Sequence, residues 1–476
     1  MPISVYNTLT RRKEELRSSR ESIGIYVCGV TPYSDTHLGH ARPSVVWDVI
    51  KKYLHYRGYK TYHVQNFTDI DDKIINRALE LGVEPLKLAE QYSEEYLESM
   101  DALGVARADL YPRVSRHIPD IISMIERLIE RGHAYAVNGN VFYSVLSFPE
   151  YGKLSNQKIE QLQAGTRFEV DPDKKHPLDF ALWKKAKPNE PAWDSPWGKG
   201  RPGWHIECSV MSHKYLGEEF DFHGGGADLI FPHHENEIAQ SEGATGRPLA
   251  KYWLHNGMIN FKQEKMSKSL GNIVKVKDLL EKYPKELIRF FILSSHYRSE
   301  LEYHDQKLEE VSRGWQRLNE CVNKLAGLVD GKEFTPEPLD EAGAALVKAA
   351  EEAEARFAAA MDDDFNTALA LGILFDFMRQ VNAYMAGLRS EAGDYALYQA
   401  YQLFAKLAGG IFGIVRLEEQ RLSGLSEPLL DLLLELRTEL RSQKLYQLAD
   451  YIRSRLAELN VAIEDTPQGP RWKMRS

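Results

Sequence analysis

Residues 22–50 read SIGIYVCGVTPYSDTHLGHARPSVVWDVI and decide how the rest of the chain is arranged. The apolar run from Ile23 to Val27 is typical of a buried parallel strand. After Arg42, apolar residues recur at helical spacing from Val45 to Ile50, which predicts that a helix follows the strand. Between strand and helix lie Cys28 and the string HLGH at residues 37–40. A strand-turn-helix unit of this kind predicts a ligand site at the carboxyl edge of a parallel sheet.

The histidine string lies where the predicted helix begins. There the imidazoles of His37 and His40, together with free backbone N–H groups, would meet an anion at the positive end of the helix dipole. Gly39 has no Cβ, so a flat group such as a purine can approach the backbone closely. The string alone is also compatible with a turn that carries two solvated histidines. A second string, KMSKS at residues 265–269, favours the nucleotide site, because two such strings rarely occur together by chance.

HLGH and KMSKS resemble the two signatures of class I aminoacyl-tRNA synthetases. The cysteine nine residues before His37 is similar to that of cysteinyl-tRNA synthetases in particular, although their first signature usually has Ile where this chain has Leu38. The resemblance implies ATP-dependent activation of L-cysteine to cysteinyl-adenylate, followed by transfer to the 3′ end of tRNA(Cys). It extends over nearly the whole chain through GWHIECS (203–209), FDFHGGGADLIFPHHENEIAQSE (220–242) and EDTPQGPRW (464–472).

The same resemblance implies roles for residues around the two signatures. The ATP phosphates would be contacted from one side by the histidine string and from the other by the lysines, and Mg²⁺ is expected with the nucleotide. Taken alone, lysines in a polar loop are solvated charges. The residues expected to act in catalysis are His37, His40, Lys265 and Lys268, and those expected to bind ATP are His37, Gly39, His40 and Lys268, with Lys268 as the stronger lysine contact.

The amino-acid pocket is also assigned by resemblance. The substrate cysteine would lie against Gly29, Thr68, Trp204 and His223, with His223 near its carboxylate. From the sequence alone, Thr68 could instead cap the following helix. His223 could equally be a structural histidine beside a glycine turn.

Two cysteines and the string PHHENE suggest a metal site. Cys28 and Cys208 fall in separate segments of the predicted sheet, which the fold could bring together. On the helix predicted for PHHENE, His233 and Glu237 share a face, whereas His234 lies about 100° round the helix from His233. Two thiolates, an imidazole and a carboxylate suit Zn²⁺, and the family's pattern matches at all four positions. The alternative is two buried thiols and a solvated histidine pair.

One zinc ion per chain would explain how cysteine is selected. A metal readily deprotonates a thiol, whose pKa is ordinarily about 8.5, whereas a serine hydroxyl is a far poorer ligand for a thiolate-rich site. A pocket that sensed only size would separate such similar amino acids by about 10–200-fold. Loss of a required polar contact can instead cost about 10⁴-fold, and recognition by a metal is of this second kind, so we expect no separate editing domain.

The composition limits the class of protein. A net charge of −9 argues against general binding of polyanions, although residues 437–476 hold eight Lys/Arg and five Asp/Glu, a local +3 that leaves −12 elsewhere. Three cysteines are too few for a disulfide framework, and Cys321 lies in an amphipathic stretch that predicts a core position. The N-terminus is too polar for a signal peptide, and no apolar run approaches a membrane span. We expect a cytoplasmic monomer with no membrane association.

The order of predicted elements indicates an α/β fold. A Rossmann-type parallel sheet forms the catalytic domain, an inserted connective domain interrupts it, and an all-helical C-terminal half follows. Predicted strands cover 61–68, 140–145 and 253–261, and predicted helices cover 118–131, 231–242, 300–328, 344–381 and a pair in 429–459 before a basic tail. The expected divisions are 1–111 (catalytic fold, first half), 112–202 (connective insertion), 203–260 (catalytic fold, second half), 261–310 (KMSKS loop and stem contact), 311–420 (helical bundle) and 421–476 (anticodon binding).

The C-terminal region offers cations and one stackable indole for unstacked anticodon bases. A ligase that passes activated cysteine to an amino sugar is the nearest alternative, but it would not need this region. A non-catalytic RNA-binding protein with a structural zinc is another, but it would need neither intact signature. Each candidate for RNA contact could singly be a solvated group: Arg437, Arg441, Lys444, Arg453, Arg471 and Trp472.

Overall fold

The computed structural model forms two compact units, Met1–Val415 and Arg416–Ser476. Within the described ranges, none of the helices combines the length and hydropathy needed to cross a bilayer. The structure describes residues 2–159, 171–188, 190–261, 264–265, 274–332, 334, 339–387, 394–416, 423–458, 461–466 and 469–474.

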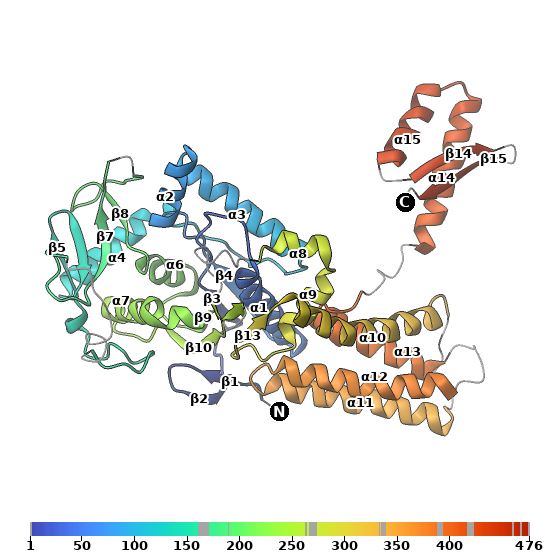
Figure 1. The fold of residues 1–476 in the computed structure, drawn as a ribbon, viewed down its shortest axis with the longest axis horizontal. Helices are drawn as coiled ribbons and strands as arrows, with labels where there is room; N and C mark the ends of the chain where they lie inside the picture. Colours follow the sequence, from blue (N-terminus) through green and yellow to red (C-terminus); the bar gives the residue numbers. More distant parts are fainter. Residues whose placement is uncertain are drawn as a thin grey trace. The chain divides into compact units, whose positions relative to one another are not determined.

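A four-stranded parallel sheet with strand order β10-β9-β3-β4 lies at the centre of the first unit (Figure 1). The apolar run after Ser22 forms β3, in which Ile25 and Tyr26 are fully buried, as expected for a strand covered on both faces. The predicted Rossmann-type sheet is confirmed. Because the strands are parallel, their carboxyl ends share one edge, where Cys28 follows β3. The strands are β3 (Ser22–Val27), β4 (Lys60–Gln65), β9 (Phe220–Gly226) and β10 (Ala250–Asn256).

Helix α1 (Leu38–Tyr56) begins within the HLGH string, as predicted. The predicted strand over 61–68 ends earlier, at Gln65, so that Thr68 follows β4 instead of belonging to it. Helix α2 (Asp72–Leu81) is capped by Asp71, whose side chain accepts from the Lys73 N–H. Helix α3 (Pro85–Ala102) follows, and a short hairpin of β1 (Ser4–Asn7) and β2 (Arg12–Glu15) precedes the sheet.

A second, antiparallel sheet is inserted between β4 and β9, with strand order β5-β6-β7-β8. The helix predicted over 118–131 and the short strand predicted over 140–145 are confirmed as α4 (Ile118–Glu130) and β6 (Asn140–Tyr143). The other strands are β5 (Ala134–Val137), β7 (Phe180–Lys185) and β8 (Gly200–Pro202).

The segment after this insertion differs from expectation. Cys208 lies in the first turn of helix α6 (Ile206–Leu216) and not in the sheet, so that part of the prediction is wrong. The segment is a helix buried on all sides, because every residue from Ile206 to Ser212 is buried, and a short apolar segment of this kind does not distinguish a buried strand from a buried helix. The helix predicted over 231–242 is confirmed in part: the backbone is extended at Phe231 (φ −136°, ψ 133°) within η4 (Ile230–His234), and the helix continues as α7 (Glu235–Thr245).

The strand predicted over 253–261 is interrupted. It is observed as β10 and β11 (Ile259–Phe261), with Gly257 and Met258 between them. Strand β11 pairs antiparallel with β12 (Glu264–Lys265) and parallel with β13 (Leu301–Tyr303).

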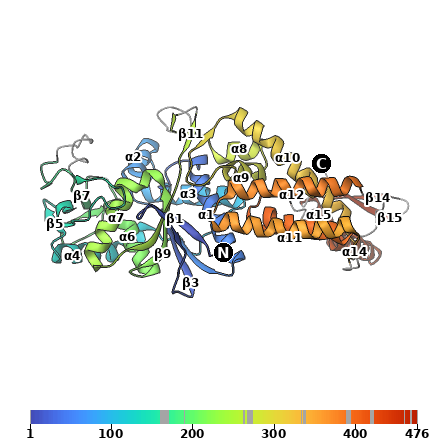
Figure 2. The same ribbon diagram turned by 90° about the horizontal axis from the view of Figure 1, so that it is seen from below.

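Helices make up the rest of the first unit, and α11 and α12 lie side by side in both views (Figure 2). The single helical stretch predicted over 344–381 is two helices, because Asp364 and Phe365 have φ values of 62° and 49°, which end a right-handed helix. These elements are α8 (Val276–Lys282), α9 (Lys285–Leu293), α10 (Asp305–Val329), α11 (Glu341–Asp362), α12 (Thr367–Gly387), α13 (Tyr395–Phe404) and η5 (Ala405–Ile411).

The second unit contains the predicted helix pair, α14 (Ser423–Ser442) and α15 (Tyr446–Glu458). The expectation of an all-helical C-terminal half is wrong at the end of the chain, where β14 (Val461–Thr466) and β15 (Gly469–Met474) form an antiparallel hairpin. Val461 and Ile463 alternate along β14 and bury against Leu434 and Leu456, a spacing of two that a strand can satisfy and a helix cannot.

Candidate active site and metal centre

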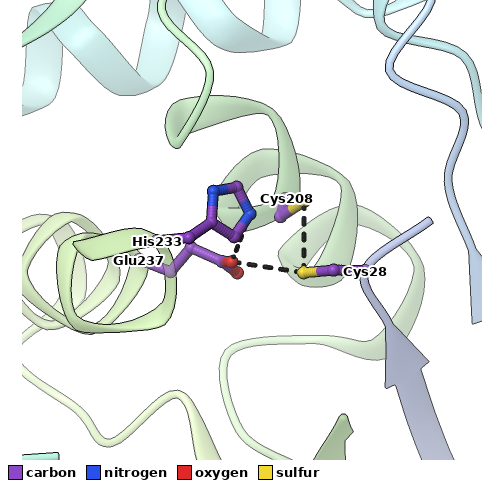
Figure 3. A group of neighbouring side chains, drawn as sticks. All are labelled: Cys28, Cys208, His233 and Glu237. Atoms are coloured by element: carbon purple, nitrogen blue, oxygen red, sulfur yellow. Dashed lines mark hydrogen bonds and ion pairs between the residues drawn. The ribbon is translucent and has the colours of Figure 1, made fainter. Parts of the chain in front are cut away.

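Four side chains from three segments meet at the carboxyl edge of the sheet (Figure 3). The Sγ atom of Cys28 lies 3.5 Å from Cys208 Sγ and 3.3 Å from Glu237 Oε1. His233 Nε2 lies 3.0 Å from the same carboxylate oxygen. One donor atom from each residue lies within 4.8 Å of all the others, so a single ion could contact all four. The structure thus brings together the four residues that the sequence predicts as metal ligands.

The cluster is buried and internally charged. Burial by itself raises the pKa of Glu237, but His223 and His233 outweigh it and hold that pKa well below its ordinary value. Burial by itself lowers the pKa of His233, but Glu237 and Cys208 raise it to about 10. Burial raises the pKa of Cys28 well above its ordinary value. Burial also acts to raise the pKa of Cys208, yet hydrogen bonds with Cys28 and His233 lower it to about 6. A carboxylate and one thiolate are therefore available to a cation.

Two sulfurs, an imidazole and a carboxylate form a donor set that fits Zn²⁺. A second possible set combines Cys28 and Glu237 with His223 and His234. That set holds one sulfur, and only the first set has two. Instead, His234 Nε2 lies 3.3 Å from Cys28 Sγ and its Nδ1 lies 2.7 Å from His255 Nε2. Burial lowers the pKa of both histidines, that of His255 to about 3, so they support the cluster as neutral hydrogen-bonding rings.

A cavity of about 290 Å³ opens beside the cluster. The rings of His37 and His40 stack on its wall with centroids 3.6 Å apart, at the N-terminus of the 19-residue helix α1. Backbone N–H groups and the helix dipole favour an anion there. The cavity therefore joins the metal cluster to the phosphate site predicted from HLGH. Its lining includes Cys28, Gly29, His37, Gly39, His40 and residues 257–259.

The second signature is described only in part. Lys265 lies in β12, opposite Asn260, and Lys268 lies outside the described residues. The chain that follows KMSKS is tied to the first signature by backbone hydrogen bonds. Leu38 N donates to Val274 O at 2.9 Å, and Val276 N donates to Thr36 O at 2.9 Å.

Two residues predicted for the amino-acid pocket belong to one buried hydrogen-bond chain. Gly29 N donates to Asn66 Oδ1 at 2.9 Å, Asn66 Nδ2 donates to Thr68 Oγ1 at 3.3 Å, and Thr68 Oγ1 donates to Glu207 Oε2 at 2.9 Å. A Cβ at Gly29 would lie 1.5 Å from the Asn66 carbonyl oxygen, so only glycine fits. Thr68 is not the helix cap, because Asp71 caps α2.

Asn66 and Glu207 are missed by the sequence analysis. A polar residue directly after a strand and a glutamate next to a predicted metal ligand are the signals that could have drawn attention to them. Both are buried, at 1% and 0% exposure.

The other two pocket candidates lie beside the metal cluster. Trp204 is 38% exposed, and its ring centroid lies 4.4 Å from that of His233. His223 is buried, stacks on Trp253 at 4.3 Å and places Nε2 2.8 Å from Glu237 Oε2. Its Nδ1 has no hydrogen-bond partner among the residues described. The glycine run after His223 permits close packing, since a Cβ at Gly225 would lie 2.8 Å from a carbon of the His234 ring.

The RNA candidates differ in accessibility. Arg437 is 1% exposed and therefore cannot contact RNA in this structure, contrary to expectation. Trp472 is half-buried, with Nε1 donating to Asp431 Oδ1 at 3.1 Å. Arg471 lies in β15 opposite Glu464. Arg441, Lys444 and Arg453 are exposed.

Cys321 is buried in α10, which confirms its predicted core position.

Comparison with known proteins gives one consistent result. Residues 15–313 match the family model of the tRNA synthetases class I (C) catalytic domain, and residues 356–416 match the DALR domain. The chain is 50% identical to the cysteine-tRNA ligase of Carboxydothermus hydrogenoformans, covering 99% of this chain and 100% of that protein. It is 51% identical to that of Pelotomaculum thermopropionicum, covering 99% of each.

The solved structures agree in fold. Mycobacterium tuberculosis methionyl-tRNA synthetase in complex with methionyl-adenylate is similar with a TM-score of 0.62 at 17% identity, covering 86% of this chain and 96% of that chain. At that identity the likeness shows the fold alone. The family model and the full-length relatives go further: the chain belongs to the cysteine-tRNA ligase family of class I aminoacyl-tRNA synthetases.

Proposed function

We propose that the chain activates L-cysteine with ATP to give cysteinyl-adenylate and pyrophosphate, and then transfers cysteine to the 3′ end of tRNA(Cys). The observation that carries this proposal is the cluster of Cys28, Cys208, His233 and Glu237, whose Cys28 lines the same cavity as the HLGH residues. It joins a thiol-selective donor set to a nucleotide site in one crevice. Full-length relatives named cysteine-tRNA ligase support it.

Cys28, Cys208, His233 and Glu237 would hold one Zn²⁺, which when bound supplies a Lewis acid that takes the substrate sulfur as a thiolate. Around it, Trp204 would cover the substrate, while His223 would receive its carboxylate. Gly29 and Thr68 lie on the fixed hydrogen-bond chain and would orient the backbone of the substrate. Loss of a required polar contact can lower reactivity about 10⁴-fold, which would make editing unnecessary.

The reacting groups meet along the cavity. The cysteine carboxylate attacks the α-phosphorus of ATP, the bond to the bridging oxygen breaks, and pyrophosphate leaves with the electron pair. His37, His40 and the N-terminal N–H groups of α1 stabilise the phosphate charge from one side, and Lys265 and Lys268 from the other, with Mg²⁺ on the nucleotide. Positioning and charge stabilisation supply the rate acceleration more than proton transfer does.

The unit Arg416–Ser476 would contact the anticodon region of tRNA. Its exposed cations Arg441, Lys444 and Arg453, together with Arg471 and Trp472, supply charge and a stacking surface. An amino-sugar acceptor gains no support from relatives that match the chain from end to end. A cytoplasmic monomer remains our prediction, in keeping with free cysteines at Cys28, Cys208 and Cys321.

Cysteine-dependent exchange of pyrophosphate into ATP tests activation, and charging of purified tRNA(Cys) tests transfer. We expect exchange with cysteine to exceed that with serine by about 10⁴-fold and to fall when a chelator removes the metal. Pyrophosphate exchange without charging of tRNA(Cys) would mean that the activated cysteine is passed to an acceptor other than tRNA. A metal-stripped protein that still activates cysteine and rejects serine would overturn the zinc mechanism.

A further inference from the structure

Arg42 is a buried cation two residues after the HLGH string. Its side chain is 1% exposed, and it projects from helix α1 onto the backbone that precedes β11. One terminal nitrogen, Nη1, donates to the carbonyls of Gly257 and Met258, each at 2.8 Å. The other, Nη2, donates to the carbonyl of Ser299. The planar guanidinium thus joins the helix of the first signature to two further segments.

The backbone that Arg42 holds is closely packed. A Cβ at Gly257 would lie 2.3 Å from the carbonyl oxygen of Ser299, so the two segments approach as nearly as glycine permits. Gly257 N donates to Tyr297 O at 2.8 Å, and Leu301 N donates to Met258 O at 3.0 Å. The carbonyls of residues 257 and 258 accept from the guanidinium, and Tyr297 O accepts both from Gly257 N and, at 3.4 Å, from Arg42 Nη2. Removal of the guanidinium would take one donor from each of these carbonyls, although Leu301 N still donates to Met258 O and Asn256 Nδ2 to Gly257 O.

This backbone forms a wall of the nucleotide cavity. Gly257 and Met258 line the same cavity as Gly39 of the first signature. Asn256 lines it too, and its side-chain oxygen is buried with no hydrogen-bond partner in the described part of the chain. Because an unpaired buried acceptor is unfavourable, this wall is suited to a ligand that brings an N–H or O–H donor.

The charge of Arg42 is a second feature of this wall. Among the described residues, no carboxylate forms an ion pair with it, and its contacts are backbone carbonyls. Burial lowers its pKa, with Glu300 opposing, to about 10, so the side chain is charged at neutral pH. A positive charge beside the cavity raises the potential felt by a polyphosphate, and Glu300 offsets that charge in part.

We propose that Arg42 is a positioning residue for ATP: it fixes the wall formed by residues 256–258, against which the nucleoside part of ATP lies opposite Gly39. This inference deepens the proposed function, since it takes ATP as the ligand of the cavity. Beyond the proposed function, the affinity for ATP depends on Arg42, because its side chain holds the backbone of residues 256–258 in place.

The test compares Arg42→Met and Arg42→Lys with a matched control. Arg289→Met removes another buried arginine, which pairs with Asp48 at 2.6 Å, donates to the carbonyls of Phe412 and Gly104, and does not line the cavity. ATP binding to the full chain is measured by isothermal titration calorimetry without cysteine, and the KM values for ATP and cysteine are measured by pyrophosphate exchange. Thermal unfolding of each variant reports its stability.

We expect Arg42→Met to weaken ATP binding and raise the KM for ATP by about 10-fold or more, with the KM for cysteine changed less than about 2-fold. Arg42→Lys keeps the positive charge but lacks the planar guanidinium that binds several carbonyls at once. Its affinity for ATP should therefore lie between that of the unaltered chain and that of Arg42→Met. Arg289→Met should lower the melting temperature and leave ATP affinity unchanged. If Arg42→Met does not fold, Arg42→Lys carries the test.

The inference is overturned if the Arg42 variants lose stability as Arg289→Met does but bind ATP as the unaltered chain does. The calorimetry also separates this inference from the proposed function. A chain that binds ATP but shows no cysteine-dependent exchange would refute the function, while the affinities of the Arg42 variants would still decide the role of Arg42.

Discussion

Replacement of Thr68 by valine tests the buried hydrogen-bond chain that supports the amino-acid pocket. Valine has nearly the shape of threonine but lacks the hydroxyl. The Thr68 hydroxyl accepts from Asn66 Nδ2 at 3.3 Å and donates to Glu207 Oε2 at 2.9 Å. Thr68 is 3% exposed and both partners are at least as buried, so solvent cannot replace the lost contacts. The substitution therefore leaves one donor and one acceptor unpaired.

The size of the effect follows from these two orphaned groups. An unsatisfied buried polar group costs about 1–3 kcal/mol. Glu207 already has one oxygen, Oε1, without a partner among the described residues, so it has no alternative contact in place. Relaxation of Asn66 would displace Gly29, whose N–H donates to Asn66 Oδ1. If one such penalty falls on the cysteine-bound transition state, kcat/KM for cysteine drops about 5- to 150-fold.

Pyrophosphate exchange at varied cysteine and varied ATP measures this drop. We expect Thr68→Val to lower kcat/KM for cysteine while the KM for ATP stays within about 2-fold, and Thr68→Ser to restore most of the loss because it returns the hydroxyl. In a double-mutant cycle, Thr68→Val and Glu207→Ala should show a coupling of about 0.5–3 kcal/mol. A Thr68→Val protein as active toward cysteine as the parent chain, with no coupling to Glu207, would refute the reasoning.

Three further predictions concern the metal, the RNA and the acid stability of the chain. Cys208→Ser should remove bound zinc and lower cysteine activation by about 100-fold or more, whereas the control Cys321→Ser should keep the metal. Mass spectrometry of the purified proteins measures the zinc content, and equal zinc in both variants would contradict the assigned ligands. Joint replacement of Arg441 and Lys444 by alanine should lower kcat/KM for tRNA charging about 10-fold at low salt and leave pyrophosphate exchange unchanged. An equal loss of activity in both assays would instead indicate damage to the fold. Burial by itself raises the pKa of Asp48, but Arg289 and Lys52 hold it below its ordinary value, so its stabilisation is present above about pH 5 and is lost as the pH falls through the folded-state pKa. Asp48→Asn should therefore destabilise the neutral protein by about 3–5 kcal/mol, because it leaves Arg289 buried without its partner, and should flatten the fall of the melting temperature in acid; an unchanged acid profile would exclude this role.

The order of strands and helices around the site could be predicted because its signals are local. The apolar run that becomes β3 and the helical spacing after Arg42 each lie within one short segment. The strand predicted over 253–261 failed at its centre, because the close approach of Gly257 to Ser299 interrupts it and those residues are far apart in sequence.

Residue identity determined by itself that the chain carries two nucleotide signatures and a thiolate-rich donor set, since these are patterns of residue types. Only the tertiary structure decided that Cys208 reaches the cluster from a helix, that Glu207 bonds Thr68 across 139 positions of sequence, and that Arg42 holds the wall at Gly257. The physical reason is that a hydrogen bond of about 3 Å depends on where the packed elements place two side chains. The periodicity of either segment therefore cannot predict that distance.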